Sequence, residues 1–218
     1  DAVGRLWVTF VQDQHVYVAY SDDLGARYST PVAVNAVPED AEHNGENRPK
    51  IAVATPAQAA EQHVYVSWTR KTSRNFTGEI RFSRSIDGGQ SFSAPATIND
   101  DDLFTGHRFE SLHLAADGSL FLVWIDKRDL EATASRDEPY VGAAIYYAVS
   151  TDGGVSFSRN VRVAHNSCEC CRIATAPHGP AEVAILWRQV FDGRVRDHAI
   201  AVLGGDGVVV GVQRATVD

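Results

Sequence analysis

A short turn motif recurs three times in this chain at nearly constant spacing. Each copy starts with Ser, carries Asp two positions later and bends at glycine; the copies occupy residues 21–25, 85–89 and 150–154. The Asp residues, Asp23, Asp87 and Asp152, lie 64 and 65 residues apart. A fixed period of this length is the signature of a repeat architecture, in which each repeat is one supersecondary unit. The period therefore predicts an array of similar units within one domain.

Short apolar segments keep the same register as the turn motif. One set ends in a large aromatic residue and occupies 6–10, 64–68, 120–124 and 183–187. Runs of β-branched and aromatic residues after turn-like stretches are typical of strands. A second set lies before the turn, at 15–20, 79–83, 144–149 and 198–203. A third set follows the turn, at 31–34, 94–98, 160–164 and 212–217. A fourth set precedes the aromatic strands, at 49–54, 110–115 and 172–176. The sequence thus predicts four strands per repeat.

Four antiparallel strands joined by tight turns form a meander, which cannot bury both of its faces alone. We therefore expect an all-β fold in which four-stranded sheets stack radially as the blades of a β-propeller. The predicted domain spans 1–218, with blade repeats at approximately 1–40, 41–100, 101–165 and 166–218.

A net charge of −8 argues against a nucleic-acid partner, which needs a basic surface. No run of 18 apolar residues predicts a membrane span.

The turn motif has a structural interpretation. Glycine supplies the positive φ of the bend, and an Asp side chain can accept hydrogen bonds from the backbone N–H groups of the turn. An aromatic residue follows both complete copies, as Phe92 and Phe157. We expect these rings to pack between neighbouring sheets, and we expect the aspartates to take no part in the chemistry of the protein.

The complete pattern, Ser-x-Asp-x-Gly-x-Ser-Phe, resembles the Asp-box of the sialidase superfamily. It is intact at 85–92 and 150–157, degraded after residue 21 and vestigial at 204–207. The resemblance implies a six-bladed propeller of which this chain forms the middle blades, with further blades outside the 218 residues. A closed four-bladed ring is the alternative. The resemblance also implies an exported protein, periplasmic or secreted.

Three arginines occupy equivalent positions at the start of the first strand of successive repeats. Arg48, Arg108 and Arg172 lie 60 and 64 residues apart. Propellers bind ligands at the mouth of the central channel, where the innermost strands begin, so these side chains are expected to surround one pocket. A guanidinium fork matches a carboxylate, and the resemblance implies that arginines hold the carboxylate of a sugar. Alternatively, the arginines pair with carboxylates between the blades.

Glycosidases of this superfamily also use a Tyr nucleophile activated by a Glu, together with an Asp acid. No motif assigns those roles in this sequence. Asp126, Glu110 and Tyr140 are the available candidates.

All three cysteines fall within five residues, as Cys168, Cys170 and Cys171. Clustered thiolates are soft ligands that suit copper or zinc. His107 occupies in the third repeat the position of Cys171 in the fourth, so the sequence predicts that His107 completes a site with them across the channel mouth. A disulfide with a cysteine outside this sequence and burial as small apolar residues are the alternatives.

Three functions follow from these features. The first is an exo-α-sialidase-like glycoside hydrolase whose partner is a small carboxylated glycan. The second is a non-catalytic exported propeller that binds copper or zinc through the cysteine cluster. The third is an interaction platform. The fold alone does not decide between them.

Overall fold

The computed structural model describes residues 1, 3–56, 59–134 and 142–216. Within them strands are the main regular structure and helix is confined to two short elements, as the repeat pattern predicts for an all-β fold. The strands are β1 (Leu6–Gln12), β2 (His15–Ser21), β3 (Val32–Ala33), β4 (Lys50–Ala54), β5 (His63–Lys71), β6 (Gly78–Ser85), β7 (Ala96–Thr97), β8 (His107–Leu114), β9 (Leu120–Asp126), β10 (Ala143–Ser150), β11 (Val161–Ser167), β12 (Ala174–Pro177), β13 (Glu182–Phe191), β14 (Val195–Gly204) and β15 (Gly207–Arg214). The helical elements are α1 (Arg128–Ala134) and the 3-10 turn η1 (Asp192–Arg194).

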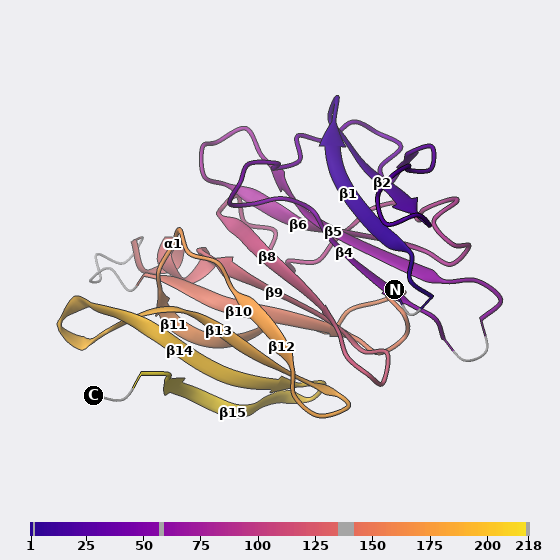
Figure 1. Cartoon of the computed structure of the whole chain (residues 1–218). Helices are drawn as coiled ribbons and strands as arrows, with labels where there is room; N and C mark the ends of the chain where they lie inside the picture. Colours follow the sequence, from indigo (N-terminus) through magenta and orange to yellow (C-terminus); the bar gives the residue numbers. More distant parts are fainter. Residues whose placement is uncertain (2, 57–58, 135–141, 217–218) are drawn as a thin grey trace.

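These strands form three antiparallel sheets that follow one another in chain order (Figure 1). The first contains β1–β2–β3, and the second contains β4–β5–β6–β7. The third holds eight strands, because β8 to β11 and β12 to β15 are joined edge to edge. Each group of strands keeps the predicted meander order. The predicted strand sets appear at their expected places, except that the last strand, expected at 212–217, is β15 at Gly207–Arg214.

The join within the third sheet differs from the expectation of separate four-stranded blades. Strand β11 continues to Ser167, which pairs with Gln189 of β13. The Gln189 side chain fixes this contact, since its Nε2 donates to the carbonyl of His165 and its Oε1 accepts from the indole N–H of Trp187. The two meanders are therefore joined at this strand pair, and they also share one buried apolar cluster that includes Ile145, Trp187 and Leu203.

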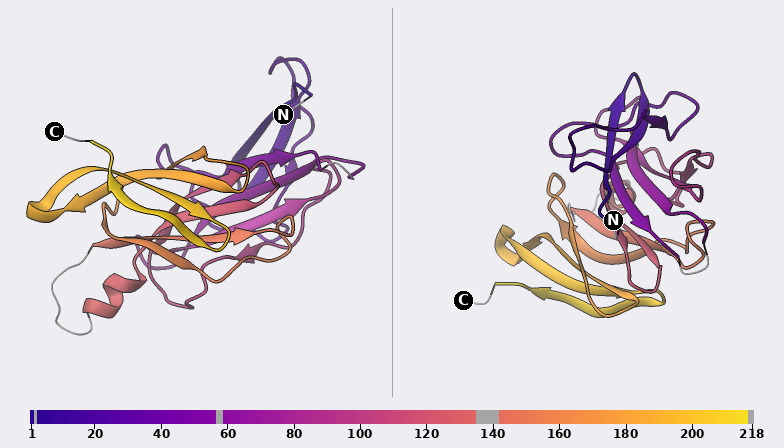
Figure 2. Two further views of the ribbon diagram at one scale, coloured as in Figure 1. Left: turned by 90° about the horizontal axis from the view of Figure 1, so that it is seen from below. Right: turned by 45° about the vertical axis from the view of Figure 1, so that its right-hand side comes forward.

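Helix α1 is the element that the strand pattern does not predict. It follows β9 directly, and Oδ1 of Asp126 accepts the backbone N–H of Arg128 at 2.8 Å, which satisfies a free donor at the helix start. The helix lies outside the sheets at an edge of the molecule (Figure 2, left). Among the described residues, no helix has the length and apolar character needed to cross a membrane.

The repeated tryptophans form the centres of the sheets, as expected from their spacing. Trp68, Trp124 and Trp187 are fully buried in three separate apolar clusters. A buried indole N–H needs an acceptor, and each has one: Glu39, Asp126 and Gln189, respectively, at 2.7–3.0 Å. Packing and a satisfied hydrogen bond account for these residues.

The turn motif has the predicted internal hydrogen bonds. In the turn after β6, Oδ1 of Asp87 accepts the backbone N–H groups of Gln90 and Ser91 at 3.0 Å, and Ser85 Oγ donates to it at 2.6 Å. Asp152 makes the same contacts after β10. Burial raises the pKa of Asp87, but these hydrogen bonds outweigh it and lower the pKa to about 2. The carboxylates are thus used within the turns.

The aromatic residue of the motif connects neighbouring sheets. Phe157, from the turn after β10, packs edge-on against Phe82 of β6 in the second sheet, with ring centroids 4.9 Å apart. Phe92 likewise packs on the cluster that contains Val16 and Val18 of the first sheet. The aromatic residue of each turn therefore packs its own sheet against the preceding one, as the sequence predicts.

The first strands of three successive meanders lie next to one another. Strand β8 contacts β4 on one side and β12 on the other. Figure 2 (right) shows the sheets fanning out from this region, from the indigo strands to the yellow ones. The residues at the starts of β4, β8 and β12 are thereby brought together.

Candidate functional site

A small cavity of about 160 Å³ lies where β4, β8 and β12 begin. Two of the three predicted arginines line it. Its wall combines cationic, acidic and apolar side chains: Glu46, Arg48, Lys50, Phe109, Glu110, Arg172 and Ile173. The repeat register therefore places side chains from three strands around one space.

Glu110 is the buried acid of this cavity. Its side chain is wholly buried, and Oε2 accepts a hydrogen bond from Thr69 Oγ1 at 2.7 Å. Oε1 has no hydrogen-bond partner and lies 3.7 Å from Lys50 Nζ. Burial raises the pKa of Glu110, while the Lys50 charge and the Thr69 hydroxyl lower it by less. A buried carboxyl oxygen without a hydrogen-bond partner is costly, so a donor group that reached this atom would stabilise the site.

A bulge in β8 explains why neighbouring residues point to different places. The pairing of β8 with β9 shifts between Arg108 and Ser111. Phe109, inside the shift, has a φ of +59°, which is uncommon for a bulky side chain. Bulges bend a strand and redirect its side chains, often beside active sites. Here Phe109 and Glu110 line the cavity, whereas Arg108 does not.

Arg108 departs from the predicted ring of three arginines. Its guanidinium binds the buried Glu42, with Nε 2.8 Å and Nη2 2.5 Å from Oε1, and it lies over the Phe109 ring. This is the inter-repeat ion pair that the sequence analysis left as the alternative. Glu42 also accepts from Asn47 Nδ2, which reaches Thr69 Oγ1 at 3.0 Å. Arg108 is thus connected to Glu110 through a buried network and does not line the cavity.

Arg48 and Arg172 are exposed at the rim of the cavity. Arg172 donates from Nε to the carbonyl of Glu46 at 3.2 Å and pairs with its carboxylate at 3.1 Å. Lys50 Nζ donates to the carbonyl of Arg48. Because these contacts are exposed to water, they are weak and can be exchanged for a ligand at low cost.

Asp126, the second acid named from the sequence, is buried away from this cavity. It accepts from Trp124 Nε1 at 2.7 Å and pairs with Arg128 at 2.8 Å. His107 lies beside it, with Nδ1 at 2.9 Å from the carbonyl oxygen of Gly78 and Nε2 at 2.9 Å from Oδ2 of Asp101. Burial lowers the pKa of His107, but the two carboxylates outweigh it and raise the pKa. Tyr140, the third candidate, lies outside the described residues.

The prediction that His107 joins the cysteines is therefore wrong. Both of its ring nitrogens are engaged by Gly78 and Asp101. His107 and Cys171 are equivalent in the repeat spacing but not in the structure. His107 is the first residue of β8 and is buried, whereas Cys171 lies in the loop before β12, which begins only at Ala174. No sequence signal distinguished these two starts.

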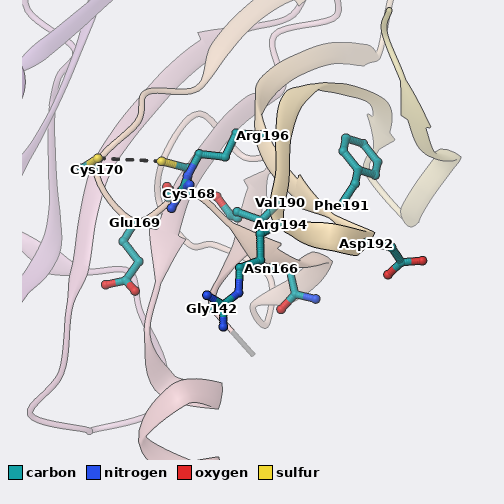
Figure 3. A pocket seen from close by; sticks show the side chains of 11 residues that line it. Gly142, Asn166, Cys168, Glu169, Cys170, Val190, Phe191, Asp192, Arg194 and Arg196 are labelled. Atoms are coloured by element: carbon teal, nitrogen blue, oxygen red, sulfur yellow. Dashed lines mark hydrogen bonds between the residues drawn. The ribbon is translucent and has the colours of Figure 1, made fainter. Parts of the chain in front are cut away.

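The cysteines form a compact cluster of free thiols between β11 and β12. Cys168 Sγ lies 2.8 Å from Cys171 Sγ and 3.8 Å from Cys170 Sγ, and all three sulfurs lie within 4.8 Å of one another. Cys168 is buried and Cys170 is exposed. Cys168 and Cys170 line a larger cavity, of about 670 Å³, together with Glu169, Asn166, Arg194 and Arg196 (Figure 3). The Cys168-x-x-Cys171 spacing brings together the two cysteines whose sulfurs lie nearest to each other.

No protein-family model matches the chain, and no curated protein matches its sequence. Several solved structures share its fold. The Hadza microbial sialidase Hz136 is 18% identical, with a TM-score of 0.58 over 98% of this chain and 45% of that protein. The intramolecular trans-sialidase from Ruminococcus gnavus is 18% identical, with a TM-score of 0.58 over 93% of this chain and 41% of that one.

The endo-arabinase from Bacteroides thetaiotaomicron is 12% identical, with a TM-score of 0.56 over all of this chain and 78% of that one. This chain thus spans less than half the length of the two sialidases. At these identities the likeness concerns the fold, which is that of a sialidase-like β-propeller.

Proposed function

We propose that this chain binds a small carboxylated sugar in the cavity at the starts of β4, β8 and β12, as part of a sialidase-like glycoside hydrolase. The observation that carries the proposal is the Oε1 of Glu110, which has no hydrogen-bond partner, in a cavity whose other charged groups are mostly cationic. A buried acid beside exposed arginines suits a ligand that carries both a carboxylate and hydroxyl groups.

In this proposal the ligand carboxylate binds the guanidinium groups of Arg48 and Arg172. Both are exposed at the rim, and charge-assisted hydrogen bonds from arginine to carboxylate are strong and directional. Glu46 now pairs with Arg172 and would be displaced. The sugar carboxylate thus takes the place of a carboxylate that the protein already holds there.

Glu110 is the catalytic candidate in the same cavity. Because its pKa is raised, Glu110 keeps its proton to a higher pH than an ordinary Glu does, as a general acid requires. Asp126 is committed to Trp124 and Arg128, so it is a weaker candidate than the sequence suggested. The six-bladed arrangement, the Asp-box assignment and export to the periplasm or outside the cell remain predictions.

The structural neighbours support a carbohydrate ligand. They include sialidases and an α-L-arabinofuranosidase from Lactobacillus brevis. They also include an ulvan lyase bound to -[GlcA(1-4)Rha3S]-, a saccharide that contains a uronic acid. The cavity of about 160 Å³ is smaller than typical sites for drug-sized ligands, so we expect it to hold a single terminal sugar.

Binding is tested by calorimetric titration of N-acetylneuraminic acid into the wild type and the Arg48→Met and Arg172→Met variants. A hydrogen bond to a charged group contributes about 1.5–3 kcal/mol, so each variant should bind roughly tenfold more weakly or worse. Arg159→Met, which removes an exposed arginine outside the cavity, is the matched control. No saturable binding by the wild type, or equal losses in all three variants, would contradict the proposal.

Catalysis is tested with a fluorogenic sialoside. We expect Glu110→Gln to retain sugar binding and to lose hydrolysis, because an amide cannot transfer the proton. Saturable binding without turnover by the wild type would favour a carbohydrate-binding propeller that lacks glycosidase activity.

A further inference from the structure

We propose that Cys168, Cys170 and Cys171 form a three-thiolate site for monovalent copper, separate from the sugar cavity. The proposal rests on convergence. The three sulfurs belong to one short segment and lie within 4.8 Å of one another, although one side chain is buried, one is half-buried and one is exposed. An ordinary loop has no packing reason to turn three such thiols toward one point.

The distances fit a small metal ion with modest adjustment. A metal–thiolate bond of about 2.3 Å places the sulfurs of a trigonal site about 4 Å apart. The Cys168–Cys170 separation is already 3.8 Å, and the Cys168–Cys171 separation of 2.8 Å needs to widen by about 1 Å. The backbone is preorganised for this arrangement, since Cys171 N–H donates to the carbonyl of Cys168, and Cys168 N–H donates to the carbonyl of Arg188.

The number and kind of ligands select the metal. Structural zinc sites almost always have four ligands, whereas soft thiolates also suit monovalent copper. Among the described residues, the group of ligand atoms within 4.8 Å contains these three thiols alone. Glu169 is engaged with Lys127 at 2.5 Å, and His178 is engaged with Glu182 at 2.9 Å. A three-coordinate soft ion is therefore the best match.

The surroundings supply charge compensation and access. Three thiolates and one monovalent cation carry a net charge of −2. Arg194 and Arg196 line the adjoining cavity, and the Arg188 side chain lies against Cys171. Figure 3 shows Arg196 beside the Cys168–Cys170 pair. The cavity gives a path to the exposed Cys170. Binding releases the thiol protons to solvent and needs no electron transfer, because copper enters as the monovalent ion.

The test is an anaerobic titration of the reduced, metal-free protein with a monovalent copper–acetonitrile complex, in competition with bicinchoninate. We expect one copper per chain and a thiolate-to-copper absorption band. Cys168→Ser, Cys170→Ser and Cys171→Ser should each lower the affinity by roughly 100-fold or more, beyond the 10–100-fold effect of groups that only support ligands. Glu169→Gln is the control within the same loop and should bind like the wild type.

Three results would overturn the site. Unchanged copper affinity in Cys170→Ser would leave only a two-thiol pair. Displacement of the copper by equimolar zinc would show that the thiolates prefer zinc. A reduced protein that binds no copper, and that on exposure to air loses two hydrogens by mass at Cys168 and Cys171, would hold a redox-active disulfide pair instead. Circular dichroism of each variant verifies that the fold is retained, so that lost binding reports on the ligands.

Discussion

Replacing Glu110 by Gln is expected to remove a loss of stability that the wild type shows as pH rises. The folded protein holds the carboxyl in full burial with one unpartnered oxygen, and its pKa is raised above the ordinary value of 4.5. Between pH 4.5 and the raised pKa, the folded state holds a proton that the unfolded state has lost. Stability of the wild type therefore falls as pH rises through this window, by at most about 1.4 kcal/mol per pH unit from this group.

Gln keeps the shape and the contact with Thr69 but does not titrate. The free energy of unfolding of Glu110→Gln, relative to wild type, should therefore rise with pH across the window and then level off. Urea unfolding at pH 5, 6, 7 and 8 measures this difference, in which the titrating groups that do not interact with Glu110 cancel. Glu46→Gln, which removes an exposed carboxylate at the same cavity, is the matched control. A difference for Glu110→Gln that is flat or falls with pH would refute the reasoning.

Three further predictions concern the rest of the fold. Asp87→Ala removes the acceptor of two backbone N–H groups and should lower the free energy of unfolding by about 1–3 kcal/mol in urea titrations, whereas Asp206→Ala in the β14–β15 turn should have little effect. Phe157→Ala should cost about 3 kcal/mol by loss of packing on Phe82; a cost no larger than that of the exposed Val155→Ala would contradict its role between sheets. Protonated His107 should stabilise the fold fully below pH 6.5, and this contribution should disappear as pH rises through the raised pKa. The decline should be absent from His107→Gln in melts between pH 6 and 9, and an unchanged decline would argue against an ionised His107.

The repeat spacing was sufficient to predict most of the strands and their meander order, but not the edge-to-edge join within the third sheet. Because Asp23, Asp87 and Asp152 mark equivalent turns, they aligned Arg48 with Arg172, and the structure places both at one cavity. The aromatic residues after the turns were also assigned correctly to contacts between sheets. Such features depend on local chemistry that each repeat shares.

Features that depend on a break in the repeat were not predictable from it. The bulge at Phe109 directs Arg108 to Glu42, although its sequence position matches those of Arg48 and Arg172. His107 has its partner in Asp101, which belongs to a loop without a counterpart in the motif. Helix α1 is one short stretch held by Asp126 and carries no long apolar period. A periodic pattern gives the common scaffold, and single side-chain contacts decide these departures.

The carboxylate requirement of the cavity is tested most directly by a comparison of two ligands that differ only at the carboxyl group. Two-dimensional NMR titrations with N-acetylneuraminic acid and with its methyl ester report binding residue by residue. We predict that the acid shifts the resonances of residues around Glu110, Arg48 and Arg172 in a saturable way, and that the ester binds roughly tenfold more weakly or not at all. Equal binding of acid and ester, or shifts located away from the starts of β4, β8 and β12, would contradict the proposed function.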